Sequence, residues 1–219
     1  MNKRNVQKEL DALLEKLPKD KPPRLLLHAC CAPCSSYVLE YLSRYFSITL
    51  LFYNPNISPQ TEYEKRYAEL LRLVREQPHR FSVSVAPCGY DPEIFFSAVR
   101  GMESLPEGGA RCAVCYRMRL EAAARAAKDG GFDYFTTTLS ISPLKDAGKL
   151  NAIGAELSGE YGVPYLYSDF KKKEGYKRSV ALSREYRLYR QNYCGCIFSK
   201  QEAERREEQK RYESNSESL

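Results

Sequence analysis

The sequence predicts an α/β fold, a single Rossmann-like domain in which a parallel sheet carries helices on both faces. Short apolar runs alternate along the chain with longer segments of helical periodicity, which is the pattern of a parallel sheet with crossover helices. The apolar runs, such as RLLLHA, have the composition of buried strands. With 219 residues, of which 43% are hydrophobic, the chain is long enough to bury such a core without covalent cross-links.

Five apolar runs are predicted to be strands. In order along the chain they are RLLLHA, SITLLFY, FSVSVAP, DYFTTTLS and VPYLYSDF. Ligands of open parallel sheets bind beyond the carboxyl ends of the strands. The loops that follow the first, second and fourth runs are polar and contain proline: HACCAPC, YNPNISP and SISPLKD. We therefore expect the functional site in these loops.

The segments between the strands carry helix signals. A first amphipathic helix is expected to end at Pro18, and the helix SSYVLEYLSRY to begin with Ser35 or Ser36 as its N-cap. A helix is also expected to start after Pro59. The remaining predicted helices are PEIFFSAVRGM, CYRMRLEAAARAAKDGG and KDAGKLNAIGAELSGEYG. We expect three parts: an N-terminal helix and linker over 1–22, an α/β catalytic domain with an iron–sulfur site over 23–199, and a charged tail over 200–219.

The composition bears on the compartment and on the chemistry of the thiols. No stretch approaches the roughly 20 apolar residues of a membrane span, and the charged N-terminus shows no secretory signal, so a cytoplasmic protein without a membrane partner is expected. Cytoplasmic thiols stay reduced, which favours metal binding or redox chemistry over structural disulfides. A net charge of +6 mildly favours a polyanionic partner.

Seven of the eight cysteines fall into three groups, and Cys88 alone is interpreted as an ordinary buried thiol. The groups are Cys30, Cys31 and Cys34; Cys112 and Cys115; and Cys194 and Cys196. Two such groups that converge in space make a four-thiol site for zinc or an iron–sulfur cluster. The dissimilar spacings CC, CxxC and CGC, and the surplus of thiols over the needs of one zinc ion, favour the iron–sulfur site.

The CGC pair and a few other polar residues allow more than one interpretation. Cys194 and Cys196 can act as a redox relay through a strained disulfide, as further metal ligands, or as buried structural thiols. Asp146 and Asp169 follow predicted strand ends, where a carboxyl group can donate a proton, although a helix cap or an ion pair explains either one equally well. His28 is expected to be a hydrogen-bonded core histidine rather than a metal ligand.

The segment from Lys171 to Arg190 is basic and rich in tyrosine. It contains eight basic and two acidic residues and leads directly into YCGC. Basic side chains neutralise phosphates, and aromatic rings stack on unpaired bases, so the segment suits RNA loops. The alternative is an amphipathic helix with a solvated basic face.

Several motifs occurring in order over about residues 24–199 resemble the QueH family of epoxyqueuosine reductases. They are LLLHACCAPCSS, FYNPNISPQTEYEKR, RCAVCYRMRLEAAARAA, FTTTLSISPLKD and DFKKKEGYKRSVALSREYRLYRQNYCGCIFS. The resemblance implies a fold like that of the adenine nucleotide alpha-hydrolases and a [4Fe-4S] cluster. It also implies the last step of queuosine synthesis, in which epoxyqueuosine at the tRNA wobble position loses its epoxide oxygen as water.

The resemblance also implies roles for individual residues. The cluster ligands are expected to be Cys30, Cys31, Cys112 and Cys115, and the redox-active pair Cys194 and Cys196. Cys34 matches a family motif position and is a candidate ligand for an additional mononuclear metal. Asp146 is the candidate proton donor, and the electron donor is not identified by the sequence.

Two alternative functions have distinct signatures. A PP-loop-type tRNA-thiolating enzyme needs a glycine-rich phosphate loop after the first strand, and HACCAPCSS contains no glycine. A zinc-stabilised RNA-binding module without catalysis would contain zinc in place of iron and sulfide.

Overall fold

The sheet of the protein has four parallel strands in the order β3-β2-β1-β4. A computed structural model describes residues 5–216. The strands are β1 (Arg24–His28), β2 (Ser47–Leu51), β3 (Val83–Ala86) and β4 (Tyr134–Thr137). Each neighbouring pair is parallel; Leu26 of β1, for example, pairs with Thr49 on one side and Phe135 on the other. The predicted α/β class with a parallel sheet is confirmed.

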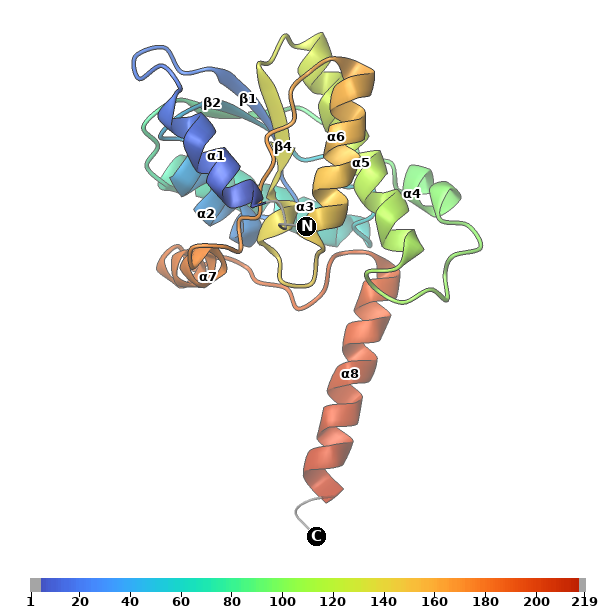
Figure 1. Ribbon diagram of the computed structural model, residues 1–219. Coiled ribbons are helices and arrows are strands. Elements are labelled where there is room, and N and C mark those ends of the chain that lie inside the picture. The colour runs from blue at the N-terminus through green and yellow to red at the C-terminus, as the bar shows by residue number, and fades with distance from the viewer. Residues whose placement is uncertain (1–4, 217–219) are drawn as a thin grey trace.

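Helices surround this sheet, and the last one projects away from the body of the molecule (Figure 1). Along the chain the helices are α1 (Val6–Glu15), α2 (Ala32–Leu42), α3 (Gln60–Glu76), α4 (Pro92–Ala98), α5 (Ala110–Asp129), the 3₁₀ helix η1 (Thr138–Ile141), α6 (Ala147–Tyr161), α7 (Gly175–Glu185) and α8 (Ile197–Ser216). In the described part of the chain, no helix has the length and apolar character needed to cross a membrane.

The two faces of the sheet form two separate hydrophobic cores. Leu25 and Leu27 of β1 pack into one core with α1, α2 and α3. Leu26 points to the opposite face and packs with α5 and α6. This alternation is the two-residue period of a strand, so a single buried strand supplies side chains to both helical layers. The expected coverage of both sheet faces is confirmed.

The fifth predicted strand is not a strand. Only an isolated bridge joins Phe135 to Tyr165. Hydrogen bonds run from the Phe135 amide to the Pro164 carbonyl and from the Leu166 amide to the Phe135 carbonyl. Pro164 has no N–H and cannot donate a further hydrogen bond to β4. The Leu166 carbonyl accepts a hydrogen bond from the Thr136 hydroxyl at 2.8 Å. The segment therefore runs beside β4 for only a few residues.

Helix α2 also begins earlier than expected. Its N-cap is Cys31, with Pro33 in the first turn, and not Ser35 or Ser36. The hydroxyls of these serines instead donate to the carbonyls of Cys31 and Pro33 within the helix. Proline is favoured in the first turn of a helix because the backbone N–H groups of that turn have no partner within the helix. The N–H that proline lacks therefore costs no hydrogen bond. As a result, Cys34 belongs to the first helical turn and not to a loop before it.

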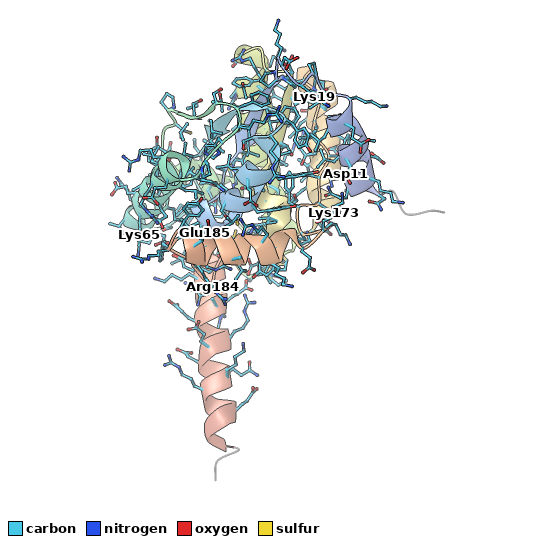
Figure 2. The ribbon with its side chains drawn as sticks, turned by 90° about the vertical axis from the view of Figure 1, so that its left-hand side faces the viewer. Asp11, Lys19, Lys65, Lys173, Arg184 and Glu185 are labelled. Carbon is cyan, nitrogen blue, oxygen red and sulfur yellow. The ribbon has the colours of Figure 1, made fainter. Side chains whose placement is uncertain are left out.

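Helix α7 lies across the base of the domain, where Figure 2 shows Lys173 beside Asp11 of α1. A second ion pair joins Arg178 of α7 to Glu40 of α2. These contacts hold α7 against α2 and the segment just before α7 against α1.

Candidate metal and substrate site

Three thiols gather where β1 ends and α2 begins. Cys30 and Cys31 follow the strand, Cys34 follows in the first turn of the helix, and the three sulfur atoms lie within 4.8 Å of one another. The Sγ atoms of Cys30 and Cys31 are 3.9 Å apart. Cys30 and Cys31 are buried. A buried group of three soft sulfur donors can hold a metal ion, at the sheet edge where the sequence places the site.

The charge in this first thiol group is concentrated on Cys30. Hydrogen bonds from Cys31 and Cys34, reinforced by the charges of Lys145 and Arg119, bring the pKa of the Cys30 thiol well below its usual value despite burial. Its neighbours shift the other way: interaction with Cys30 is the largest cause that raises the pKa of Cys31 to about 12. Cys30 is therefore the most acidic thiol of the first group.

A second thiol group is assembled from α5 and the segment after α7. Cys112 and Cys115 lie in the first turns of α5, and with Cys194 and Cys196 they line a small cavity. Burial raises the pKa of Cys115 to about 12 and also raises the pKa of Cys196. Cys115 and Cys196 share an apolar cluster with Phe95. All four thiols of this second group are free.

A cavity of about 430 Å³ opens beside the first thiol group. One wall is the loop 141–145 after η1, and another is formed by α7 and the segment 190–194. Cys194 and Glu107 line this cavity and also the small cavity of the second thiol group, so the two groups face adjoining spaces. Two exposed apolar side chains, Leu144 and Tyr176, belong to the same lining.

Four buried cations lie around the thiols, and the sequence analysis did not single them out. Arg66 is 2% exposed, Arg111 is 2% exposed, Arg119 is 1% exposed and Lys145 is 9% exposed. Arg66 and Arg119 interrupt the apolar stripes of α3 and α5, at helical spacing from buried Leu70 and Tyr116. A charged residue on a buried helix face was the signal available in the sequence, because such residues are almost never buried without a partner.

Arg119 connects the second thiol group to the strand β1, and its charge lowers the pKa of Cys30 in the first group. Its Nη1 lies 3.9 Å from the Cys115 Sγ, Nη2 donates to the Asn54 side-chain oxygen at 2.6 Å, and Nε donates to the His28 ring at 3.3 Å. The His28 Nδ1 lies 2.9 Å from the Thr137 hydroxyl, and Nε2 lies 3.1 Å from the Tyr53 carbonyl oxygen. Burial, aided by the Arg119 charge, lowers the pKa of His28 to about 3. His28 is thus the hydrogen-bonded core histidine predicted.

The acidic candidates lie in different settings. Asp146 is exposed and is the N-cap of α6, where it accepts from the amides of Gly148 and Lys149. It is absent from the residues that line the 430 Å³ cavity. Asp169 forms an ion pair with Lys171. The cap and the ion pair are the structural interpretations that the sequence left open, and no contact brings either carboxyl group to the thiols.

The basic, tyrosine-rich segment contributes directly to the cavity. Tyr176 of α7 and Arg190, Tyr193 and Cys194 from the connection to α8 all belong to the lining. Ser183 holds Arg190 through a 3.1 Å hydrogen bond. With Arg66 and Lys145 deeper in the cavity and Glu107 as the acid among the described lining residues, the space favours an anionic ligand.

Together these features define a class: a thiol-rich α/β protein whose site suits a soft metal and a negatively charged substrate. A family model described as epoxyqueuosine reductase QueH matches residues 25–202. The chain is 41% identical over 200 residues to epoxyqueuosine reductase QueH of Staphylococcus epidermidis, covering 89% of this chain and 84% of that protein. It is 44% identical over 179 residues to the Streptococcus pyogenes protein of the same name, covering 81% and 70%. The chain belongs to the QueH family, an oxidoreductase family.

The chain is also similar to solved structures. U34-tRNA thiolase NcsA from Methanococcus maripaludis, solved with its [4Fe-4S] cluster, matches with a TM-score of 0.49 and 12% sequence identity. The match covers 89% of this chain and 68% of the thiolase.

Proposed function

We propose that this protein reduces epoxyqueuosine in tRNA to queuosine. The reaction consumes two electrons and two protons: both C–O bonds of the epoxide break, the oxygen leaves as water, and a C=C bond joins the two carbons. Membership of the QueH family carries this proposal. The cavity supports it, because a space lined by thiols, cations and exposed rings suits a nucleotide delivered beside redox-active sulfur.

We further propose that Cys30, Cys31, Cys112 and Cys115 hold a [4Fe-4S] cluster, with Cys34 as a ligand of an additional mononuclear metal. The donor chemistry fits, because thiolates are the usual ligands of such clusters. A buried charge fits as well: Arg119 lies among thiols without a carboxylate partner in the described chain, and an anionic centre would balance it. When bound, the cluster supplies electrons one at a time.

The proposed role of Cys194 and Cys196 is that of a dithiol reductant. When a dithiol closes to a disulfide, it releases two electrons and two protons, which is the amount that the epoxide consumes. Cys194 supports the role by its position, since it lines both cavities. A reductant that the sequence does not identify would then restore the dithiol. The cytoplasm, where thiols are kept reduced, is the proposed compartment.

The tRNA is proposed to reach the site over α7 and the connection that follows it. Tyr176 is 39% exposed and Leu144 is 55% exposed at the cavity, where they can stack on unpaired bases. Arg190 and the neighbouring exposed lysines of the segment would neutralise phosphates. Asp146 as proton donor stays a prediction, without support from its contacts.

The test is conversion by the purified protein. Protein purified without oxygen and reduced chemically is incubated with tRNA carrying epoxyqueuosine, and the digested nucleosides are analysed by mass spectrometry. We expect epoxyqueuosine to be replaced by queuosine, which has one oxygen atom fewer. The Cys30→Ser variant under the same conditions is the control for reduction by the chemical reductant alone. Unchanged epoxyqueuosine with iron-loaded, folded protein would refute the proposal.

A further inference from the structure

Lys145 is a buried cation in the wall of the cavity. It closes the loop 141–145, of which every residue lines the 430 Å³ space. It lies one position before Asp146, but the two side chains lie in different settings: Lys145 is 9% exposed, whereas Asp146 is exposed and caps α6. The side chain that reaches the cavity from this loop is therefore the ammonium group and not the carboxylate.

The ammonium group of Lys145 has no hydrogen bond or carboxylate ion pair within residues 5–216. The other two cations of the cavity make hydrogen bonds within the protein: Arg66 donates to Glu62 at 2.7 Å and to the Cys194 carbonyl at 3.0 Å, although its Nη2 has no partner, and Arg190 donates to Ser183 at 3.1 Å. The ammonium group of Lys145 has three donors, and at the cavity wall an acceptor on a bound ligand can receive them. The unpaired donors of Lys145 indicate a ligand in the cavity.

The surroundings of Lys145 indicate what that ligand is. Lys145 lines the same cavity as the thiols of Cys30, Cys34 and Cys194. A permanent positive charge beside redox-active sulfur lies where electrons enter the substrate. The atom that gains negative charge as the epoxide opens is its oxygen, and a preorganised cation stabilises such an atom strongly in a dry site.

We propose that the ammonium group of Lys145 contacts the epoxide oxygen and donates a hydrogen bond to it while the C–O bonds break. This inference rests on the proposed function. The two electrons come from the reductant of the site, and the two protons that complete the water molecule come from the dithiol or from solvent. Lys145 stabilises the departing oxygen and is itself neither oxidised nor reduced.

The experiment compares Lys145→Met and Lys145→Arg with the wild type in single-turnover reactions of pre-reduced enzyme with tRNA carrying epoxyqueuosine. Lys128→Met is the matched surface control, because it replaces an exposed lysine in the last turn of α5, at the end of that helix away from Cys112 and Cys115. We expect Lys145→Met to slow turnover by about 100-fold or more, as for loss of one oxyanion donor. Lys145→Arg should recover part of the rate, and Lys128→Met should match the wild type. Iron and sulfide content and the affinity for tRNA should stay within about threefold.

Three results would overturn the inference. Lys145→Met turns over within threefold of the wild type, or it loses iron in proportion to its activity, or a stronger reductant restores its rate. The second result would make Lys145 a structural residue, and the third would make it a residue that tunes the reduction potential. A wild type that leaves epoxyqueuosine unchanged would instead refute the proposed function, and this inference with it.

Discussion

The two thiol groups differ in their surroundings although they lie side by side. The first group follows β1 directly, lines the larger cavity, and contains Cys30, whose pKa is lowered by its neighbours. The second is built from the start of α5 and the segment around Cys194, and burial raises the pKa of Cys115 within it. The difference shows that hydrogen bonds dominate the pKa shift at Cys30, whereas burial dominates the shift at Cys115.

The largest effect is expected from the first group. Cys30→Ser removes the most acidic thiol of the group, which is also a proposed cluster ligand, so we expect loss of bound iron and of essentially all turnover. Iron and sulfide analysis and the tRNA conversion assay measure this. Cys88→Ser, which changes a thiol outside both groups, should keep the iron and the activity. If Cys30→Ser kept its iron, the first group would not be the metal site.

A substitution of Cys194 distinguishes the proposed redox pair, Cys194 and Cys196, from the proposed cluster ligands. Cys194→Ser should retain iron, because Cys194 is not a proposed ligand, and should slow multiple turnover by about 10-fold or more. Single turnover with a strong chemical reductant should be affected less. Equal multiple-turnover rates in the variant and the wild type would remove the dithiol role, and loss of iron would make Cys194 a ligand.

Arg119 contacts Cys115 of the second group, and its charge acts on Cys30 of the first. Its removal therefore tests how much this residue stabilises the fold between the two thiol groups. Arg119→Met leaves Asn54 and His28 without their shared donor, and we expect a loss of about 3–5 kcal/mol in the free energy of unfolding. Chemical denaturation measures it. Arg117→Met, on the same helix with exposed partners Glu156 and Glu160, should cost under about 1 kcal/mol. Equal effects of the two substitutions would contradict the bridging role.

The smallest effect is expected at the mouth of the cavity. Tyr176→Ala removes an exposed ring and should weaken tRNA binding by about 5–10-fold, within the range of one lost base stack. Tyr176→Phe keeps the ring and should bind like the wild type. Filter binding or fluorescence anisotropy at fixed salt decides the matter. If the Tyr176→Ala variant bound tRNA as tightly as the Tyr176→Phe variant, base stacking at this position would be excluded.

The fold was largely predictable from the sequence, because buried strands and amphipathic helices leave local patterns. The four strands and the helices that cover them follow from those patterns. The misassigned strand at Pro164 depended on a competing hydroxyl from Thr136, which is a long-range contact. The early start of α2 depended on Cys31 serving as N-cap without a side-chain hydrogen bond, a geometry that serine and threonine rules do not anticipate.

The site was predictable in its residue types and less so in its arrangement. The cysteines were all identified as candidates, but spacing does not show that Cys34 lies within 4.8 Å of Cys30 and Cys31. Arg66 and Arg119 had a signal in the apolar stripes of their helices. No local sequence pattern indicated that Lys145 is buried, because its burial depends on how the loop after η1 folds over the thiols.

The account depends most on the proposal that both thiol groups hold one iron–sulfur cluster. The direct measurement is iron and acid-labile sulfide in anaerobically purified protein, for the wild type, Cys30→Ser and Cys112→Ser. We predict a brown wild-type protein with iron and sulfide in equal amounts, and loss of both in each variant. A colourless wild-type protein that contains zinc and no sulfide would contradict the account.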